Sequence, residues 1–178
     1  MRYLKSLLVS LCVFLIAGCA SPVAPAHYAG QQPVLDLQQY FNGTLDAWGM
    51  FQDRSGTVVK RFTVVMKCHW DGDVGTLDED FTYSDGTRQQ RVWTLRKTGP
   101  NRFIGTAPDV VGEAVGETAG NALRWNYVLA LPVDGRVYHV NFADWMFLMD
   151  QRVMLNRAEM SKFGVSLGAV TLAFVKRP

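Results

Sequence analysis

The chain has 178 residues, of which 48% are hydrophobic and 19% are charged, and its formal net charge is +2. This length supports one domain with a sizeable core. Residues 1–18 contain two basic residues and no acidic one. Without them, 16 Lys and Arg balance 16 Asp and Glu. The mature chain is therefore expected to be near neutral, and no basic field indicates a nucleic-acid partner.

The first 19 residues have the pattern of a bacterial lipoprotein signal. Arg2 and Lys5 precede an apolar run, residues 7–17, which is shorter than the about 20 residues of a membrane-spanning helix. The run ends at Ile16-Ala17-Gly18-Cys19, which matches a lipobox. We expect residues 1–18 to be removed and Cys19 to carry acyl chains that anchor the protein to a membrane. The alternative is an ordinary secretory signal or a membrane anchor with an incidental cysteine.

The residues after Cys19 predict where the anchor lies and how the domain is attached. Ala20 stands where lipoproteins retained at the inner membrane have Asp, which favours the periplasmic face of the outer membrane. Residues 19–33 are rich in Ala, Pro and Ser and predict a flexible tether. Residues 34–178 predict a single domain. A short helical turn is expected at residues 34–40, with Asp36 near its start.

Cysteine and histidine usage argues against disulfides and metals. After processing and lipidation only Cys68 remains, so no intramolecular disulfide can form. The three histidines are far apart in sequence, and no zinc-type spacing occurs. No Ser-His-Asp order or evident carboxylate pair indicates catalysis. We therefore expect no cofactor, and the sequence favours a binding or structural protein over an enzyme.

From residue 43 onward the hydrophobic pattern has a period of two, which indicates half-buried strands. The apolar positions of the best-defined strands are Val64, Met66 and Cys68; Leu77, Phe81 and Tyr83; and Leu123, Trp125, Tyr127, Leu129 and Leu131. Gly-containing turns separate about nine such strands. Consecutive hairpins suit an up-and-down barrel or a sandwich, and we predict an antiparallel lipocalin-like barrel. A membrane pore is not favoured, because pores turn apolar residues outward.

Two segments depart from the alternation. Gly112, Gly116 and Gly120 recur every fourth residue in a stretch that also holds Glu113 and Glu117. It lacks the Lys of a phosphate-binding loop, so we expect a strand bent by glycine or a loop at the barrel rim. At residues 144–149 a bulge or a buried corner is expected. Asp144 could cap a turn there or accept a hydrogen bond from Trp145.

Glu79 is the most informative polar residue because it shares the inner parity of Leu77 and Phe81. A three-residue loop at residues 84–86 would pair Tyr83 with Thr87 and place Glu79 opposite Arg91. A buried carboxylate needs such a partner. The pair could be a structural ion pair or the anchor for a ligand head group. A two-residue loop would instead turn Arg91 to the other face.

Trp93, Trp125 and Tyr127 share the predicted interior with Glu79 and Arg91. Their ordinary role is core packing, because aromatic side chains dominate core burial. They would line an apolar ligand cavity equally well. Small inner residues such as Gly49 and Gly105 leave room, whereas the aromatic residues fill it, so the sequence does not decide whether the barrel is hollow.

Several motifs taken together resemble a family of proteobacterial lipoproteins known only as a domain of unknown function. They are Leu77-x-Glu79-x-Phe81-x-Tyr83-x-Asp85-Gly86, Asp109-Val110-Val111-Gly112, Gly120-Asn121-Ala122-Leu123, Asp144-Trp145-Met146 and Lys162-Phe163-Gly164. The resemblance covers residues 37–175. It implies a lipocalin-like barrel and no established activity. It also implies a lipid connection, since genes of the family often lie near those for fatty-acyl modification.

The sequence therefore supports two main functional hypotheses. In the first, an outer-membrane lipoprotein binds a lipid or another apolar small molecule in its barrel, with Glu79, Arg91, Trp93, Trp125 and Tyr127 as candidate ligand-binding residues. In the second, the barrel is filled, and the protein has a structural or envelope-assembly role through contacts of its outer surface. Free space inside the barrel separates the two hypotheses.

Overall fold

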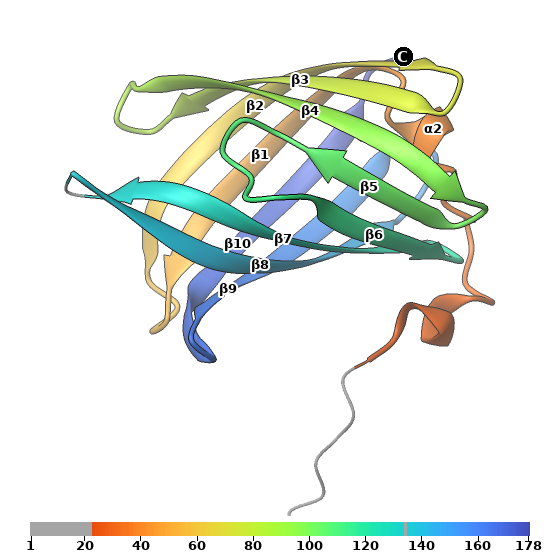
Figure 1. The fold of residues 1–178 in the computed structure, drawn as a ribbon. Coiled ribbons are helices and arrows are strands. Elements are labelled where there is room, and N and C mark those ends of the chain that lie inside the picture. The colour runs from red at the N-terminus through yellow and green to blue at the C-terminus, as the bar shows by residue number, and fades with distance from the viewer. Residues whose placement is uncertain (1–22, 134) are drawn as a thin grey trace, which may run out of the picture.

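A computed structural model describes residues 23–133 and 135–178. The predicted signal peptide and Cys19 lie outside the described residues. Ten antiparallel strands form one closed barrel, shown in Figure 1. Each strand pairs with its neighbours in the sequence, and the first pairs with the last, so the topology is up-and-down. The predicted all-β barrel is confirmed.

The ten strands replace the nine that the sequence predicted. They are β1 (Gly43–Asp53), β2 (Val58–Asp71), β3 (Val74–Tyr83), β4 (Arg88–Gly99), β5 (Arg102–Thr106), β6 (Ala114–Ala119), β7 (Ala122–Val133), β8 (Arg136–Leu148), β9 (Val153–Lys162) and β10 (Val165–Lys176). The added strand is β6, within the glycine-containing segment. Gly112 and Gly120 stand on either side of it with φ of 72° and 53°. Such positive φ angles favour glycine.

The inner face carries the core, as the period-two pattern predicted. Val64, Met66 and Cys68 are buried along β2, while Lys67 between them is exposed. Burial, followed by the nearby charge of Glu79, raises the pKa of the Cys68 thiol to about 12. Cys68 is thus a small core side chain rather than a reactive thiol.

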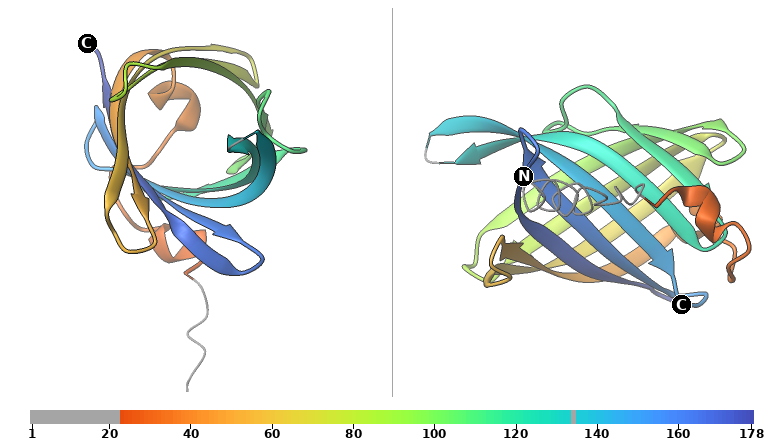
Figure 2. Two further views of the ribbon diagram at one scale, coloured as in Figure 1. Left: turned by 90° about the vertical axis from the view of Figure 1, so that its left-hand side faces the viewer. Right: turned by 90° about the horizontal axis from the view of Figure 1, so that it is seen from below.

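A short helix, α2 (Leu37–Tyr40), closes one end of the barrel. The carboxylate of Asp36 caps it by accepting a hydrogen bond from the Gln39 amide at 3.0 Å. Tyr40 is buried, and its hydroxyl donates to the Arg152 carbonyl at 3.0 Å. Trp70 fixes the end of the helix through Nε1, which donates to the Phe41 carbonyl at 2.8 Å. Figure 2 (left) shows α2 at the far end of the barrel, seen from the opposite end.

Part of the predicted flexible tether lies against the barrel wall. A 3-10 helix, η2 (Pro25–Tyr28), places the Tyr28 ring edge-on against Trp145 and Phe147, with centroid distances of 5.3 and 5.1 Å. A little further on, the Leu35 amide donates to the Gly120 carbonyl at 2.8 Å. The sequence did not predict this contact, because Tyr28 is isolated in a Pro- and Ala-rich stretch. In the described part of the chain, no helix has the length and apolar character to cross a bilayer.

Candidate ligand-binding cavity

The barrel is hollow. It encloses a cavity of about 1130 Å³ that runs from the α2 end to the opposite end. Leu37 and Phe41 form its floor, where both are buried. Val59, Val133 and Val137 line it at the other end, where they are 61%, 49% and 63% exposed. This end is therefore the mouth of the cavity, and a filled barrel is excluded.

The inner glycines that suggested free space are covered by aromatic rings. A Cβ at Gly49 would overlap the Phe62 ring, and a Cβ at Gly105 would lie 2.7 Å from the Trp125 ring. Gly116 on β6 contacts the same indole from a neighbouring strand. The backbone thus approaches Trp125 closely because two residues lack side chains. These glycines therefore do not line the cavity, which is bounded by the side chains that cover them.

Gly116→Ala is expected to lower the free energy of unfolding by about 1–3 kcal/mol, because the added methyl overlaps the Trp125 ring. Gly99→Ala is the matched control at the end of β4, where the nearest atom to the new Cβ is 3.7 Å away. Urea unfolding followed by tryptophan fluorescence measures both. Equal stability of the two variants would contradict the close packing of Gly116 on Trp125.

The five side chains predicted to bind a ligand all line this cavity: Glu79, Arg91, Trp93, Trp125 and Tyr127. The aromatic members form one cluster. Trp93 contacts Trp125 and Tyr127 edge-on, with centroid distances of 5.9 and 5.5 Å. Tyr127 stacks on Phe142 at 5.1 Å. The cluster gives the cavity a rigid apolar wall around its polar groups.

The predicted pairing of Glu79 with Arg91 is confirmed. The Tyr83 amide donates to the Thr87 carbonyl at 2.9 Å, and Glu79 stands opposite Arg91 in the β3–β4 ladder. Arg91 Nη1 lies 3.9 Å from Glu79 Oε2. That distance makes a loose ion pair, and no hydrogen bond joins the two groups.

The closer partner of Arg91 is Asp109, which the sequence did not single out. Arg91 Nε and Nη2 donate to Asp109 Oδ2 at 3.0 and 2.6 Å. Asp109 is held in the loop between β5 and β6, which runs beside β7. There the Ala130 amide donates to the Asp109 carbonyl, and Val111 donates to the Val128 carbonyl, both at 2.8 Å. These backbone contacts place Asp109, a loop residue, in the cavity wall.

Asp144 on β8 is a third carboxyl group in the cavity wall. Neither role predicted for it is correct, because it caps no turn and faces inward, away from Trp145. It is 5% exposed, and Tyr127 donates a long hydrogen bond of 3.4 Å to Oδ2. Oδ1 is buried without a hydrogen-bond partner. The expected bulge is also absent here, since β8 pairs in unbroken register with β7 and β9 around Asp144.

Burial sets the protonation of these groups. It raises the pKa of Glu79 to about 7, against the lowering effect of Arg91 and with a further increase from Asp109. Burial likewise raises the pKa of Asp144 to about 7, although the Tyr127 hydrogen bond opposes this. Burial would lower the pKa of Arg91, but the carboxylates of Glu79 and Asp109 outweigh that effect and raise it. The cavity wall therefore holds the charged guanidinium of Arg91, the Asp109 side chain bound to it, and two acids, Glu79 and Asp144, whose pKa values are raised to about 7.

This arrangement can orient a ligand by hydrogen bonds inside an apolar chamber. Glu79 and Asp144 each donate a hydrogen bond to a ligand oxygen when neutral and accept one from a ligand donor when charged. Among residues 23–133 and 135–178, no group of three or more His, Cys, Asp or Glu is placed to hold a metal ion.

A closed antiparallel barrel around a lined cavity defines the lipocalin-like class of folds. A family model places the chain more narrowly: residues 13–176 match DUF3833, a family described as proteins of unknown function. The chain belongs to this family. No curated protein matches the chain.

Three solved structures are similar to the chain at low sequence identity. An S-type phycobiliprotein lyase from Guillardia theta superposes with a TM-score of 0.57 and 6% identity, covering 81% of this chain and 94% of the lyase. A protein of unknown function of the DUF3598 family from Nostoc punctiforme gives 0.48 and 12%, covering 83% and 51%. A de novo designed fluorescence-activating β-barrel gives 0.45 and 13%, covering 80% and 99%. The lyase likeness shows the fold alone.

Proposed function

We propose that this protein is an outer-membrane lipoprotein of a proteobacterium whose barrel binds a lipid or another apolar small molecule. The observation that carries the proposal is the cavity of about 1130 Å³, whose walls are mostly apolar and include the polar groups of Glu79, Arg91, Asp109 and Asp144. Ligand sites of proteins have this character, with a few polar groups that fix the orientation of a mainly apolar ligand. In this proposal Glu79, Arg91 and Asp109 hold the polar end of the ligand, and Trp93, Trp125 and Tyr127 contact its apolar part.

The location rests on the sequence. Ile16-Ala17-Gly18-Cys19 matches a lipobox, and acyl chains on Cys19 would anchor the protein stably. Ala20 favours the outer membrane, with the domain on its periplasmic side. The competing proposal, a filled barrel that acts only through its outer surface, loses its basis because the interior is hollow.

Native mass spectrometry tests the binding proposal. All ten strands lie within residues 43–176, so residues 23–178 form a complete folding unit that can be purified from a bacterial periplasm without detergent. We expect an added mass that organic solvent extracts and that fragments as an acyl chain. A clean mass that persists after incubation with envelope lipid extract would contradict the proposal.

Leu172→Trp is expected to abolish most of the added mass, because Leu172 lines the cavity and an indole there occupies ligand space. Thr171→Trp is the matched control, since the adjacent residue of β10 faces the other side of the sheet. Native mass spectrometry of both variants gives the measurement. Equal occupancy in the two variants would place the bound molecule outside the barrel.

A further inference from the structure

Exposed apolar side chains gather at the mouth of the barrel. Six of them are Val59, Val133, Val137, Phe163, Val165 and Leu167, which are between 41% and 90% exposed. They lie on or beside the tips of the β1–β2, β7–β8 and β9–β10 hairpins. The strands of these hairpins are consecutive in the barrel, so the three tips follow one another around the rim. We call these six residues the mouth surface.

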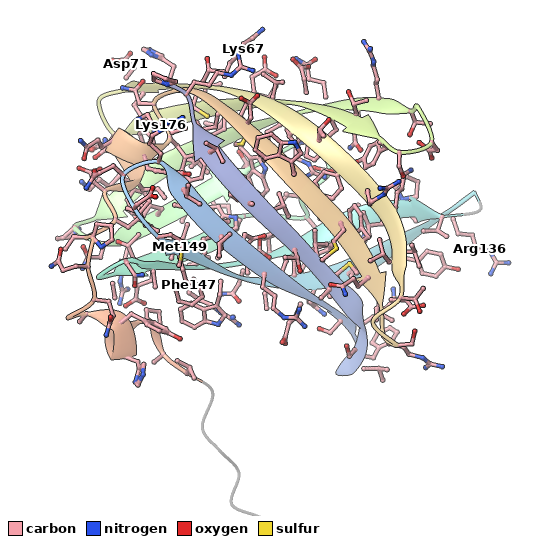
Figure 3. The ribbon with its side chains drawn as sticks, turned by 180° about the vertical axis from the view of Figure 1, so that it is seen from behind. Lys67, Asp71, Arg136, Phe147, Met149 and Lys176 are labelled. Atoms are coloured by element: carbon pink, nitrogen blue, oxygen red, sulfur yellow. The ribbon has the colours of Figure 1, made fainter. Side chains whose placement is uncertain are left out.

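The hairpins that carry the mouth surface can be located in two views. Figure 1 shows the three hairpin tips at the end of the barrel away from α2. In Figure 3, Arg136 extends from the β7–β8 tip, while Met149 and Lys176 lie toward the opposite end. A soluble protein rarely exposes apolar groups in such a cluster unless they contact a partner or a membrane.

Phe163 is the most exposed member, at 90% of its surface. It stands at the tip of the β9–β10 hairpin with a φ of 51°, a backbone conformation that bulky residues rarely adopt. The Lys162 ammonium lies 5.2 Å from the ring centroids of both Phe163 and Tyr138. An aromatic ring beside a lysine is the combination found at membrane interfaces, where the ring enters the bilayer and the ammonium stays in water.

The same hairpins carry an excess of positive charge. With the neighbouring tip of the β3–β4 hairpin, residues 53–60, 84–88, 133–138 and 162–167 contain five basic residues, Arg54, Lys60, Arg88, Arg136 and Lys162, and three acidic ones, Asp53, Asp85 and Asp134. Lys60 forms an ion pair with Asp85, with 2.9 Å between Nζ and Oδ2. Basic residues at an interface are attracted to anionic lipid. The charge of the rim therefore complements a bilayer that contains anionic lipid.

The mouth surface is continuous with the interior. Val59, Val133, Val137 and Leu167 belong to the rim and also line the cavity. An apolar path thus leads from the exposed tips to the chamber. A protein partner would not need this continuity, whereas a lipid that leaves a bilayer would cross no water along it.

We propose that the mouth surface docks on an anionic lipid bilayer and that the cavity exchanges its ligand with that bilayer through the mouth. The evidence for docking is the exposed apolar rim and its positive charge, and it does not depend on a bound ligand. Only the exchange rests on the proposed ligand-binding function.

Vesicle co-sedimentation of residues 23–178, which lack Cys19, tests docking apart from lipid anchoring. We expect binding to phosphatidylcholine vesicles that contain one third phosphatidylglycerol, and weaker binding to phosphatidylcholine alone. The triple variant F163S/V165S/L167S is expected to reduce binding about tenfold or more, because three apolar side chains leave the interface. The control is V115S/M149S/L155S, which removes three exposed apolar side chains away from the mouth. It is expected to bind like the parent chain.

Thermal melting checks that both triple variants are folded. Docking is overturned if the parent chain fails to sediment with anionic vesicles, or if the two triple variants lose binding equally. Rim-dependent dimers that form without vesicle binding would also overturn it, in favour of self-association. Vesicle binding by a chain whose mass shows no ligand would retain docking and contradict the proposed ligand exchange.

Discussion

Asp144→Asn is expected to stabilise the protein above neutral pH. In the folded protein the pKa of Asp144 is about 7, whereas its ordinary value is 3.8. The folded state therefore holds the proton more tightly than the unfolded state. Below about pH 4 both states are protonated and stability is fully present. As the pH rises to 7 the unfolded state loses its proton first, and stability falls. Asn carries no charge at any of these pH values, so this loss disappears.

The expected gain is up to about 4 kcal/mol above pH 7, which corresponds to the shift between the two pKa values. Urea unfolding between pH 4 and pH 8 measures it. Glu79→Gln should act in the same direction, because the pKa of Glu79 is also raised to about 7. Asp80→Asn serves as the control, since Asp80 lies on the outer face of β3 and is exposed. A pH dependence that survives Asp144→Asn unchanged would show that Asp144 does not titrate in this range.

An acid that lowers stability at neutral pH is informative about function. Asp144 has an unpartnered Oδ1 and faces a cavity that an apolar side chain would line at less cost. Proteins commonly retain such destabilising groups where a ligand or reaction uses them. Asp144 thus joins Glu79 and Asp109 among the groups that a ligand would contact in the proposed function.

Asp109→Ala is expected to lower the free energy of unfolding by about 3 kcal/mol, because it leaves the Arg91 guanidinium in the cavity wall without its hydrogen-bonded carboxylate. The remaining partner, Glu79, is 3.9 Å away. For a domain of this size the melting temperature should fall by roughly ten degrees. Thermal melting at pH 7 gives the measurement.

Two further variants test whether the unpaired charge of Arg91 causes the loss of stability in Asp109→Ala. Asp80→Ala removes an exposed carboxylate from the outer face of β3 and should leave the melting temperature nearly unchanged. The double variant D109A/R91M removes both charges and should recover most of the lost stability, since the apolar chain needs no partner. A double variant as unstable as Asp109→Ala would indicate that the β5–β6 loop, and not the charge, is responsible.

The sequence predicted those parts of the site that depend on local geometry. The opposition of Glu79 and Arg91 follows from one hairpin loop and the alternation of two adjacent strands, and the structure has that register. Asp109 could not be found this way, because a loop after β5 brings it to Arg91. Asp144 left a usable signal: it continues the inner parity of Val140 and Phe142, which the neighbouring aromatic residues obscured.

The fold was predictable because it too depends on the local geometry of adjacent strands. Up-and-down barrels are built from contacts between successive strands, so each hairpin could be inferred separately. Strand β6 was uncertain because the inner position at its middle is Gly116, which has no side chain to show alternation. The docking of Tyr28 joins segments more than a hundred residues apart, and no local pattern indicates which outer aromatic residues it meets.

If Cys19 anchors the protein as proposed, the contact of Tyr28 with Trp145 and Phe147 limits the length of the free tether between the barrel and the membrane. It lies near Gly120, at the end of the barrel opposite the mouth. In a chain anchored through Cys19, only residues 20–22 would separate the anchor from the described segment, a reach of roughly 10 Å. The mouth would then point away from the anchoring bilayer. If Tyr28 left Trp145 and Phe147, the free tether would lengthen to roughly 45 Å. The barrel could then turn its mouth toward that bilayer. In a chain anchored in this way, the contacts of Tyr28 would limit which surfaces the mouth can reach.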